Sequence, residues 1–324
     1  MRARIVFLGT PEFACPTLDY LLGDNSGVDV VAVLTQPDRP AGRNLETQSS
    51  KVKLLMKSYF NEKGKRAKKI LVLSPESVGQ PEIIKQIDDL KPDLAIVVAF
   101  GQILKPDFLK LFKYGGVNLH ASILPRWRGA APIAWAILSE DPVTGVTLQK
   151  VAPVLDSGDI IATSQVDLDE TWDAPKLYAE LAHRGADIIK RHLQEYLEGT
   201  LKGVPQDDSQ VTLAPKIKKE QGLVDWNLRA GQICARIRAF NPWPGVWTTR
   251  QGKKLKILRA QPLEYKGSFA PGFLVSQDKY GFAVQCGGST ALLITVIQPE
   301  SRARQPASEY LKGYPFSKGE KLGD

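Results

Sequence analysis

The chain has 324 residues, 43% of them hydrophobic and 24% charged, which is enough to bury a full core and long for one domain, so two folded domains are expected. Its net charge of +8 is uneven, because residues 215–324 hold 18 Lys and Arg against 8 Asp and Glu, a net charge of +10, whereas residues 1–214 carry −2. The longest apolar run, residues 94–100, is far shorter than the roughly 18 residues of a membrane span, and no apolar leader precedes Pro11, which excludes a membrane protein and predicts a cytoplasmic one.

Short aliphatic runs alternate with helix-length segments in the first 200 residues. The expected strands cover residues 4–8, 28–34, 70–73, 94–100, 116–120 and 145–151, and the expected helices cover residues 11–22, 80–90 and 174–197. Strands separated by crossover helices are typical of a mostly parallel sheet. Residues 1–198 are therefore predicted to form an α/β domain.

The turn after the first strand is not predicted to bind a dinucleotide. Gly9 is followed by Thr10 and Pro11, and the spaced glycines of GxGxxG are missing. We interpret Thr10 as a helix N-cap and Pro11 as the first helical residue, and expect no nicotinamide cofactor.

The pattern changes after a polar segment, residues 199–214, which is predicted to be a linker. Short expected strands at residues 254–260, 272–276, 281–286 and 291–298 are separated by turn residues. Residues 215–324 are therefore predicted to form a small antiparallel barrel.

Cysteine and histidine usage argues against a metal site. The three cysteines, Cys15, Cys234 and Cys286, are far apart and form no CxxC pair, as expected for buried thiols in a reducing cytosol. His183 and His192 are nine residues apart on an expected helix and would not meet on one metal. No metal is predicted.

Two polar residues interrupt the apolar strand at residues 116–120. Asn118 and His120 are two apart, so both side chains point to the same face, and the carboxyl ends of parallel strands border the ligand crevice of such sheets. Either residue alone could simply cap a strand end. A third polar group, Asp156, lies in the turn-rich segment after the strand at 145–151, which we place at the same end of the sheet.

An amide, an imidazole and a carboxylate together suit the transfer of an acyl group between two nitrogens. The Asn118 amide and a protonated His120 could donate to the tetrahedral oxyanion. His120 could also deliver a proton to the departing nitrogen, while Asp156 accepts protons from the incoming amine. The nearby Asp159 is interpreted as a turn residue.

The same residues carry a resemblance. NLHASILP at residues 118–125 and LDSGD at 155–159 resemble the folate-dependent formyltransferase superfamily, and RWRGAAPI at 126–133 is similar to its methionyl-tRNA formyltransferase family. RIVFLGTPEFA at residues 4–14, QPDRPAGR at 36–43 and FNPWPG at 240–245 are similar to the same family, so the resemblance spans nearly the whole chain.

The resemblance implies a Rossmann-like, folate-binding catalytic domain at residues 1–198 and an OB-like, tRNA-binding barrel at residues 215–324. It implies that Asn118, His120 and Asp156 are catalytic and that two loops line the folate site: Phe100, Gly101, Gln102, Ile103 and Leu104, with Ser122, Ile123, Leu124 and Pro125. The implied reaction moves the formyl group of 10-formyltetrahydrofolate to the α-amino group of methionyl initiator tRNA. The enzyme is expected to be a monomer whose partners are this tRNA and a reduced folate, with no membrane.

The expected tRNA contacts are cationic. The resemblance implies a contact at Arg43, although Asn44, Leu45 and Glu46 stand where the family often has further lysines. In the basic C-terminal third, Lys216, Lys218 and Arg238 are candidates, with Ile217 and Ile237 packing inward between exposed cations. The tryptophans Trp226, Trp243 and Trp247 are interpreted as packing residues rather than platforms for bases.

Other functions remain open at the level of sequence. The same Asn-His-Asp set would serve a formyltransferase acting on a small amine, such as a nucleotide-linked amino sugar or glycinamide ribonucleotide, or a hydrolase that releases formate. The chain could also be a non-catalytic RNA-binding protein. A basic C-terminal unit of this size favours tRNA over a small amine.

Overall fold

The structure is a computed structural model that describes residues 2–41, 46–64, 69–267, 269–317 and 319–323. The chain forms two compact units. The first comprises Met1–Pro132, Val143–Asp167 and Tyr178–Ala214, and the second comprises Ile133–Pro142, Leu168–Leu177 and Pro215–Asp324. Residues 199–214, the predicted linker, lie within the first unit. The functions assigned to the two domains stay predictions.

The first unit is built on a seven-stranded sheet in the order β10-β9-β7-β6-β1-β2-β5. Its strands are β1 (Ala3–Gly9), β2 (Val28–Leu34), β5 (Leu71–Leu73), β6 (Leu94–Val98), β7 (Gly116–His120), β9 (Val143–Lys150) and β10 (Ile160–Asp167). Strands β7, β6, β1, β2 and β5 are mutually parallel. Strand β9 is antiparallel to β7, and β10 is antiparallel to β9. The expected α/β fold with a mostly parallel sheet is confirmed.

The direction of β9 corrects one expectation. Lys150, at the end of β9, is paired with Val117 near the start of β7, so β9 does not lead to the carboxyl end of the parallel strands. The loop that follows folds back, and the Lys150 amide donates to the Asp159 carbonyl. Asp156 therefore approaches the face of the sheet from this returning loop.

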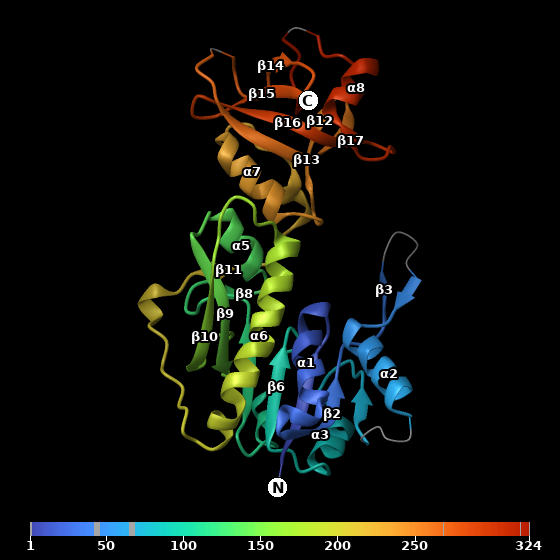
Figure 1. The fold of residues 1–324 in the computed structure, drawn as a ribbon, viewed down its shortest axis with the longest axis vertical. Helices are drawn as coiled ribbons and strands as arrows, with labels where there is room; N and C mark the ends of the chain where they lie inside the picture. The colour runs from blue at the N-terminus through green and yellow to red at the C-terminus, as the bar shows by residue number, and fades with distance from the viewer. Residues whose placement is uncertain (1, 42–45, 65–68, 268, 318, 324) are drawn as a thin grey trace. The chain divides into compact units, whose positions relative to one another are not determined.

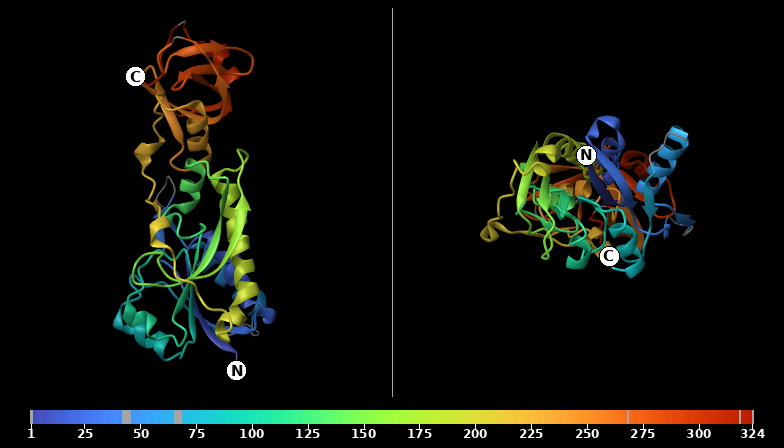
Figure 2. Two further views of the ribbon diagram at one scale, coloured as in Figure 1. Left: turned by 90° about the vertical axis from the view of Figure 1, so that its left-hand side faces the viewer. Right: turned by 90° about the horizontal axis from the view of Figure 1, so that it is seen from below.

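Helices cover both faces of the sheet. They are α1 (Cys15–Leu22), α2 (Lys51–Lys63), α3 (Pro81–Asp88), α4 (Pro106–Leu109) and α6 (Ala174–Leu197). A further helix, α5 (Pro132–Leu138), belongs to the second unit except for its first residue. Helices α1 and α6 lie on one face and α3 and α4 on the other (Figures 1 and 2). Ile87 of α3 and Phe108 of α4 pack with Val6 and Leu8 of β1 in one buried cluster.

The predicted helix at residues 11–22 begins later than expected. Residues Glu12–Ala14 form a 3-10 turn, and α1 begins at Cys15 with Ala14 as its N-cap. The Thr10 hydroxyl donates instead to the Phe100 carbonyl at 2.9 Å, so the N-cap interpretation is wrong.

Two short pairings complete the first unit. The strands β3 (Arg39–Ala41) and β4 (Glu46–Gln48) form an antiparallel ribbon. The strand β8 (Arg128–Gly129) is parallel to β11 (Leu213–Ala214), so the end of segment 199–214 is attached to the loop that follows β7. This attachment holds residues 126–129 beside the end of β7.

The second unit is an antiparallel sheet, as predicted, in the order β12-β13-β16-β15-β14 with β17 paired to β16. Its elements are β12 (Val246–Arg250), β13 (Lys253–Glu264), β14 (Leu274–Gln277), β15 (Phe282–Cys286), β16 (Thr290–Pro299), β17 (Gln305–Pro306), α7 (Ala230–Ala239) and α8 (Ala307–Gly313). The C-terminal segment bridges the two end strands, because the Leu274 amide donates to the Glu320 carbonyl and the Gly323 amide donates to the Thr249 carbonyl.

Two predictions in this unit are wrong. Residues 236–238 belong to helix α7, and all three side chains are half-buried, so cations and isoleucine do not alternate there. Trp243 is 56% exposed and not a packing residue.

None of the described helices of either unit combines the length and the apolar character needed to cross a membrane.

Candidate active site

The antiparallel pairing of β7 with β9 creates a polar patch on one face of the sheet. Asn118 is paired with Gln149, and His120 is paired with Thr147. Paired residues of neighbouring strands point to the same face, so all four polar side chains lie together. His120, Thr147 and Gln149 are buried, which makes this patch a candidate site rather than a solvated edge.

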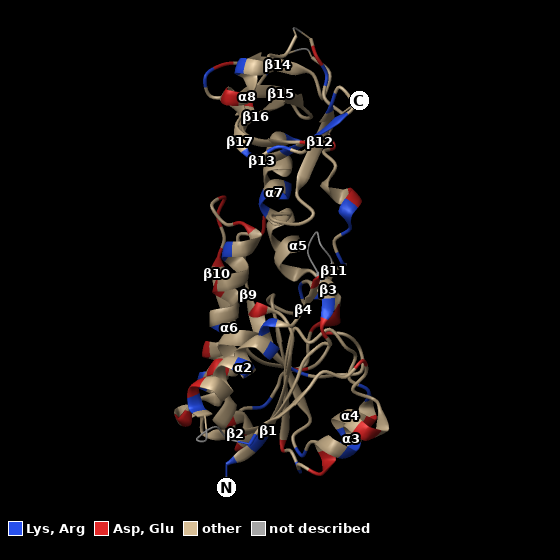
Figure 3. Cartoon of the chain, turned by 90° about the vertical axis from the view of Figure 1, so that its right-hand side faces the viewer, with Lys and Arg blue, Asp and Glu red and all other residues tan. Residues whose placement is uncertain are grey.

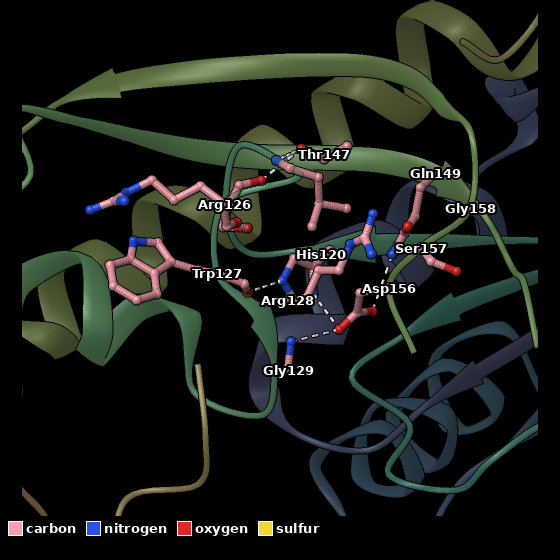
Figure 4. A network of polar contacts seen from close by, with 12 residues as sticks. His120, Arg126, Trp127, Arg128, Gly129, Thr147, Gln149, Asp156, Ser157 and Gly158 are labelled. Carbon is pink, nitrogen blue, oxygen red and sulfur yellow. Dashed lines mark hydrogen bonds and ion pairs between the residues drawn. The ribbon is translucent and has the colours of Figure 1, made fainter. Parts of the chain in front are cut away.

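His120 and Asp156 meet on this patch, as predicted. The His120 Nδ1 lies 3.5 Å from the Asp156 Oδ2, and the two side chains are only 7% and 9% exposed. Figure 4 shows Asp156 between His120 and the backbone of Gly129. A carboxylate and an imidazole held this close in a poorly solvated position can exchange protons with a bound amine.

The second nitrogen of His120 also has a protein partner. The His120 Nε2 lies 2.8 Å from the Trp127 carbonyl, and it carries the hydrogen because a carbonyl oxygen only accepts (Figure 4). Trp127 itself has a φ of 64°, in the left-handed region that non-glycine residues rarely adopt. The backbone of residue 127 therefore fixes the orientation of the imidazole.

The carboxylate of Asp156 is held through both oxygens. The Gly129 amide donates to Oδ2 at 2.9 Å, and the Gln149 side-chain amide donates to Oδ1 at 3.1 Å. Asp156 has a φ of 53°, so its backbone is in the left-handed region as well. The surroundings therefore determine a conformation that Asp156 would rarely adopt by itself.

The side chain of Asn118 stands apart from this network. It is half-buried, and among the described residues its amide has no hydrogen-bond partner. An amide with unused donors beside a paired imidazole and carboxylate is available to an oxyanion. The geometry therefore fits the role predicted for Asn118, which stays a prediction.

Sequence reasoning missed three residues of the network, namely Gly129, Gln149 and Gln206. The Gln206 amide contacts the backbone of the Asp156 loop, and its oxygen contacts Arg128. A signal was available for Gln149, because a glutamine inside a run of buried strand residues needs a specific partner. Gln206 lies in a polar segment without regular pattern, where the sequence carries no such signal.

The two loops expected to bind folate leave the same edge of the sheet. Residues 100–104 follow β6 and residues 122–125 follow β7, and these strands are parallel neighbours. Within the first loop, Phe100 and Leu104 are buried in the core, and Gln102 bonds to the backbone of Pro75 and Val78. Gly101 and Ile103 are exposed.

The second loop is held to the sheet by its own polar groups. The Ser122 hydroxyl donates to the Arg126 carbonyl at 2.6 Å, and the Leu124 amide donates to the Thr147 hydroxyl at 3.1 Å. Ser122 and Leu124 are buried, whereas Ile123 and Pro125 are half-buried. Both loops are therefore rigidly attached beside Asn118 and His120, and their role in folate binding stays a prediction.

The predicted tRNA contacts differ in their surroundings. Arg43 lies outside the described residues. Lys216 and Lys218 are exposed on either side of the buried Ile217, as expected. Arg238 is half-buried, and its Nε is buried without a hydrogen-bond partner among the described residues. Charge from Arg238 also contributes, after hydrogen bonds from Thr171, to a lowered pKa of Asp169.

Sequence profiles match the chain over most of its length. Residues 3–193 match the profile described as formyl transferase, and residues 216–315 match the profile of the formyl transferase C-terminal domain.

Individual relatives agree with these profiles. A methionyl-tRNA formyltransferase of Bdellovibrio bacteriovorus is 43% identical over 326 residues, covering 99% of both chains. The methionyl-tRNA formyltransferase of Bacillus subtilis is 39% identical over 320 residues, covering 99% of this chain and 98% of the relative.

Solved structures support the same fold. WlaRD, a sugar 3N-formyl transferase, is 18% identical with a TM-score of 0.65 over 94% of this chain and 100% of its own. HypX from Aquifex aeolicus is 18% identical with a TM-score of 0.56 over 100% of this chain and 51% of its own. The site and these relationships together lead to one conclusion: the chain belongs to the formyl transferase family and, within it, to the methionyl-tRNA formyltransferases.

Proposed function

We propose that the protein transfers the formyl group of 10-formyltetrahydrofolate to the α-amino group of methionine on initiator tRNA. The observation that carries this proposal is the contact of His120 with Asp156 on the face of the sheet that also carries Asn118, in a chain with full-length similarity to methionyl-tRNA formyltransferases. The product is N-formylmethionyl-tRNA, the form used to begin translation. We further propose that the enzyme acts in the cytoplasm as a monomer.

The site residues divide the chemistry of formyl transfer between them. The amine of methionine attacks the formyl carbon, a new carbon–nitrogen bond forms, and the bond to the folate nitrogen breaks. Asn118 donates its free amide hydrogens to the oxyanion, a contribution worth about 10²- to 10³-fold in rate. Asp156 accepts the proton that the amine loses, and His120 supplies one to the leaving nitrogen.

This role of His120 requires a local rearrangement. Both ring nitrogens face protein groups, with Nε2 on the Trp127 carbonyl and Nδ1 near Asp156. Proton delivery therefore requires that one of these groups release its nitrogen when substrate binds.

We expect a folate to bind beside these residues. The sugar 3N-formyl transferase WlaRD was crystallised in the presence of 5-N-formyl-THF, and HypX in complex with tetrahydrofolic acid. In this chain, the exposed Gly101 and Ile103 can lie against a flat ring system, and the rigid 122–125 loop offers backbone groups beside His120. The folate supplies the formyl group, and these loops hold it against the three polar residues.

The tRNA is best accommodated by a basic face on the second unit, for which we use the name β12–β13 face. It consists of Lys219, Trp247, Lys254 and Lys256. Trp247 is paired with Lys256 across the two strands, the Lys254 ammonium lies 4.0 Å from the centre of the Trp247 ring, and Lys219 lies on the segment that pairs with Trp247 through Leu223.

The cations of the β12–β13 face are close enough to affect one another. Burial, followed by the charges of Lys256 and Lys219, lowers the pKa of Lys254. Figure 3 shows Lys and Arg along β12 and β13. An anion bound among these lysines reduces their mutual repulsion, and the phosphates of an RNA backbone supply a row of anions. Lys216 and Lys218 extend this face along the chain.

A small amine is the main alternative substrate. The relatives named as methionyl-tRNA formyltransferases are about 40% identical along the whole chain, whereas the sugar 3N-formyl transferase is 18% identical. This difference favours tRNA.

The test compares formylation of methionyl initiator tRNA with formylation of a nucleotide-linked amino sugar and of glycinamide ribonucleotide, with 10-formyltetrahydrofolate as donor. Wild-type protein is expected to act on the tRNA, and the His120→Ala variant to be nearly inactive. Activity confined to the small amines would exclude our assignment, and RNA binding without any transfer would indicate a non-catalytic protein.

A further inference from the structure

The side chain of Gln206 joins three parts of the first unit around Asp156. Its Nε2 donates to the carbonyls of Asp156 at 2.9 Å and Gly158 at 2.7 Å, and it lies 3.3 Å from the Gln149 Oε1. Its Oε1 accepts from the Arg128 guanidinium at 3.0 and 2.8 Å. Every polar atom of this amide is therefore in use.

The orientation of this amide is unambiguous. A guanidinium group only donates, so the atom facing Arg128 is the oxygen, and carbonyl groups only accept, so the atom facing Asp156 and Gly158 is the nitrogen. The same logic orients Gln149, whose oxygen faces Gln206 and whose nitrogen faces the Asp156 carboxylate. The two glutamines thus hold the backbone and the carboxylate of Asp156 from different sides.

The backbone around Gln206 is attached to the same loop. Val204 and Ile160 exchange two hydrogen bonds of 2.8 Å, and Gly203 packs so closely on Asp159 that an added Cβ would lie 2.6 Å from the Asp159 Cβ. On the other side, Arg128 is only 10% exposed and directly precedes Gly129, whose amide donates to Asp156. Gln206 therefore connects the loop that carries Asp156 to the strand that binds its carboxylate.

We propose that Gln206 is a positioning residue for formyl transfer, which holds the left-handed backbone at Asp156 so that the carboxylate stays beside His120. This inference rests on the proposed function. Asp156 has a φ of 53°, and a loop with this conformation needs its carbonyl groups fixed from outside. Gln206 fixes the carbonyl of Asp156 itself and that of Gly158.

Two substitutions separate positioning from folding. Gln206→Met removes all the hydrogen bonds at nearly constant volume. Gln206→Glu keeps an acceptor for Arg128, so residue 206 stays attached to β8. It replaces the donor to the Asp156 and Gly158 carbonyls with an anion, so these two hydrogen bonds are lost. Gln210→Met is the matched control, since Gln210 is exposed in the same segment and, among the described residues, its side chain bonds only to Asp207.

We expect kcat to fall by up to about 100-fold in both Gln206 variants, with the KM of each substrate changed less than about twofold, and no change in the control. An unchanged kcat, or a KM that rises in proportion, would overturn the inference. Thermal midpoints identify any unfolded variant, and Gln206→Glu decides the question if Gln206→Met does not fold.

A second readout needs no substrate. The chain has only three histidines, so ring ¹⁵N spectra of histidine-labelled protein are simple, and the His120→Ala variant assigns the His120 signals. We expect both Gln206 variants to shift the His120 signals and to leave those of His183 and His192 in place. Unmoved His120 signals would contradict the inference even if the wild type formylates tRNA. Failure of the wild type to formylate tRNA would contradict only the proposed function.

Discussion

Gly129 is a position where one methyl group should disturb the active site. Its φ is 126°, and a Cβ added there would lie 2.8 Å from the Ala214 carbonyl oxygen of β11. Its amide also donates to the Asp156 carboxylate. Gly129→Ala should therefore displace the amide and lower kcat by about 10-fold or more.

Gly199→Ala is the matched control for this substitution. Gly199 has a φ of 75°, but an added Cβ would meet nothing within 4 Å. The control has a left-handed backbone cost of about 1–2 kcal/mol without a clash, so stability should fall in both variants and kcat in Gly129→Ala alone. Equal kcat values in the two variants would show that the Gly129 amide is unimportant for Asp156. Steady-state kinetics and urea unfolding measure both effects.

Asn118 and Gln149 offer a paired test, because they lie opposite each other on β7 and β9. The Asn118 amide has no partner among the described residues, so Asn118→Ala should leave the thermal midpoint nearly unchanged and lower kcat by about 10²- to 10³-fold. Gln149 is 2% exposed and bonds to Asp156, so Gln149→Ala should lower both stability and kcat. A stability loss in Asn118→Ala as large as that in Gln149→Ala would mean that Asn118 is structural.

At the scale of residues, sequence alone brought Asn118 and His120 together because strand geometry has a period of two. It could not find the groups that orient them. The backbone of Trp127, the Gly129 amide and the Gln206 side chain reach the site through loop conformations, and loop conformation has no periodicity to read. The interpretation of Trp243 failed for a related reason, since an aromatic residue between two prolines can be buried or exposed with equal ease.

At the scale of elements, hydrophobic runs predicted most strands of both sheets and the helices α1, α3 and α6. They did not predict strands β10 and β12, helices α2, α5 and α7, or the direction of β9. A run of buried residues indicates a strand without indicating whether it is parallel or antiparallel to its neighbour. The connection between β7 and β9 contains β8 and α5, and its path determines the direction. The pairing of Asn118 with Gln149 depends on this direction. The sequence of β9 alone therefore could not predict that Gln149 lies beside Asn118 in the site.

The β12–β13 face carries the next prediction. Lys254→Gln together with Lys256→Gln removes two cations whose side chains share one face of β13. We expect weaker binding of tRNA, and a plot of log K against log salt whose slope falls by roughly 2, one for each lost phosphate contact.

A pair of turn lysines provides the control for charge. Lys266 and Lys279 are exposed in the turns between β13 and β15, and their replacement by glutamine changes the net charge by the same amount. If this control weakens tRNA binding equally, the effect belongs to overall charge and the β12–β13 face has no special role. Formylation of tRNA at several salt concentrations provides the same comparison through KM.

At the scale of the whole molecule, the stability of the second unit depends on how its C-terminal segment is fastened. Residues 320–323 bridge β14 and β12 through backbone hydrogen bonds, and the buried Arg250 guanidinium donates to the Glu320 carboxylate. Arg250 bonds to both carboxylate oxygens of Glu320, to the Tyr310 hydroxyl and to the carbonyls of Tyr314 and Pro315. Only 7% of the Arg250 side chain and 14% of the Glu320 side chain are exposed.

This ion pair makes stability dependent on pH. The hydrogen bonds from Arg250 lower the pKa of Glu320 below its ordinary value of about 4.3, so the folded form binds its proton less readily than the unfolded chain. The stabilisation is therefore complete above the unfolded pKa and is lost as pH falls through the lower, folded pKa. Glu320→Gln should cost about 2 kcal/mol at neutral pH and progressively less in acid, as the wild type loses the same charge. Hydrogen exchange at the Leu274 amide, which bonds to the Glu320 carbonyl, measures the loss locally, with urea unfolding as the global comparison. A cost that stays constant from neutral pH to about pH 3 would mean that Glu320 contributes through packing rather than through its charge.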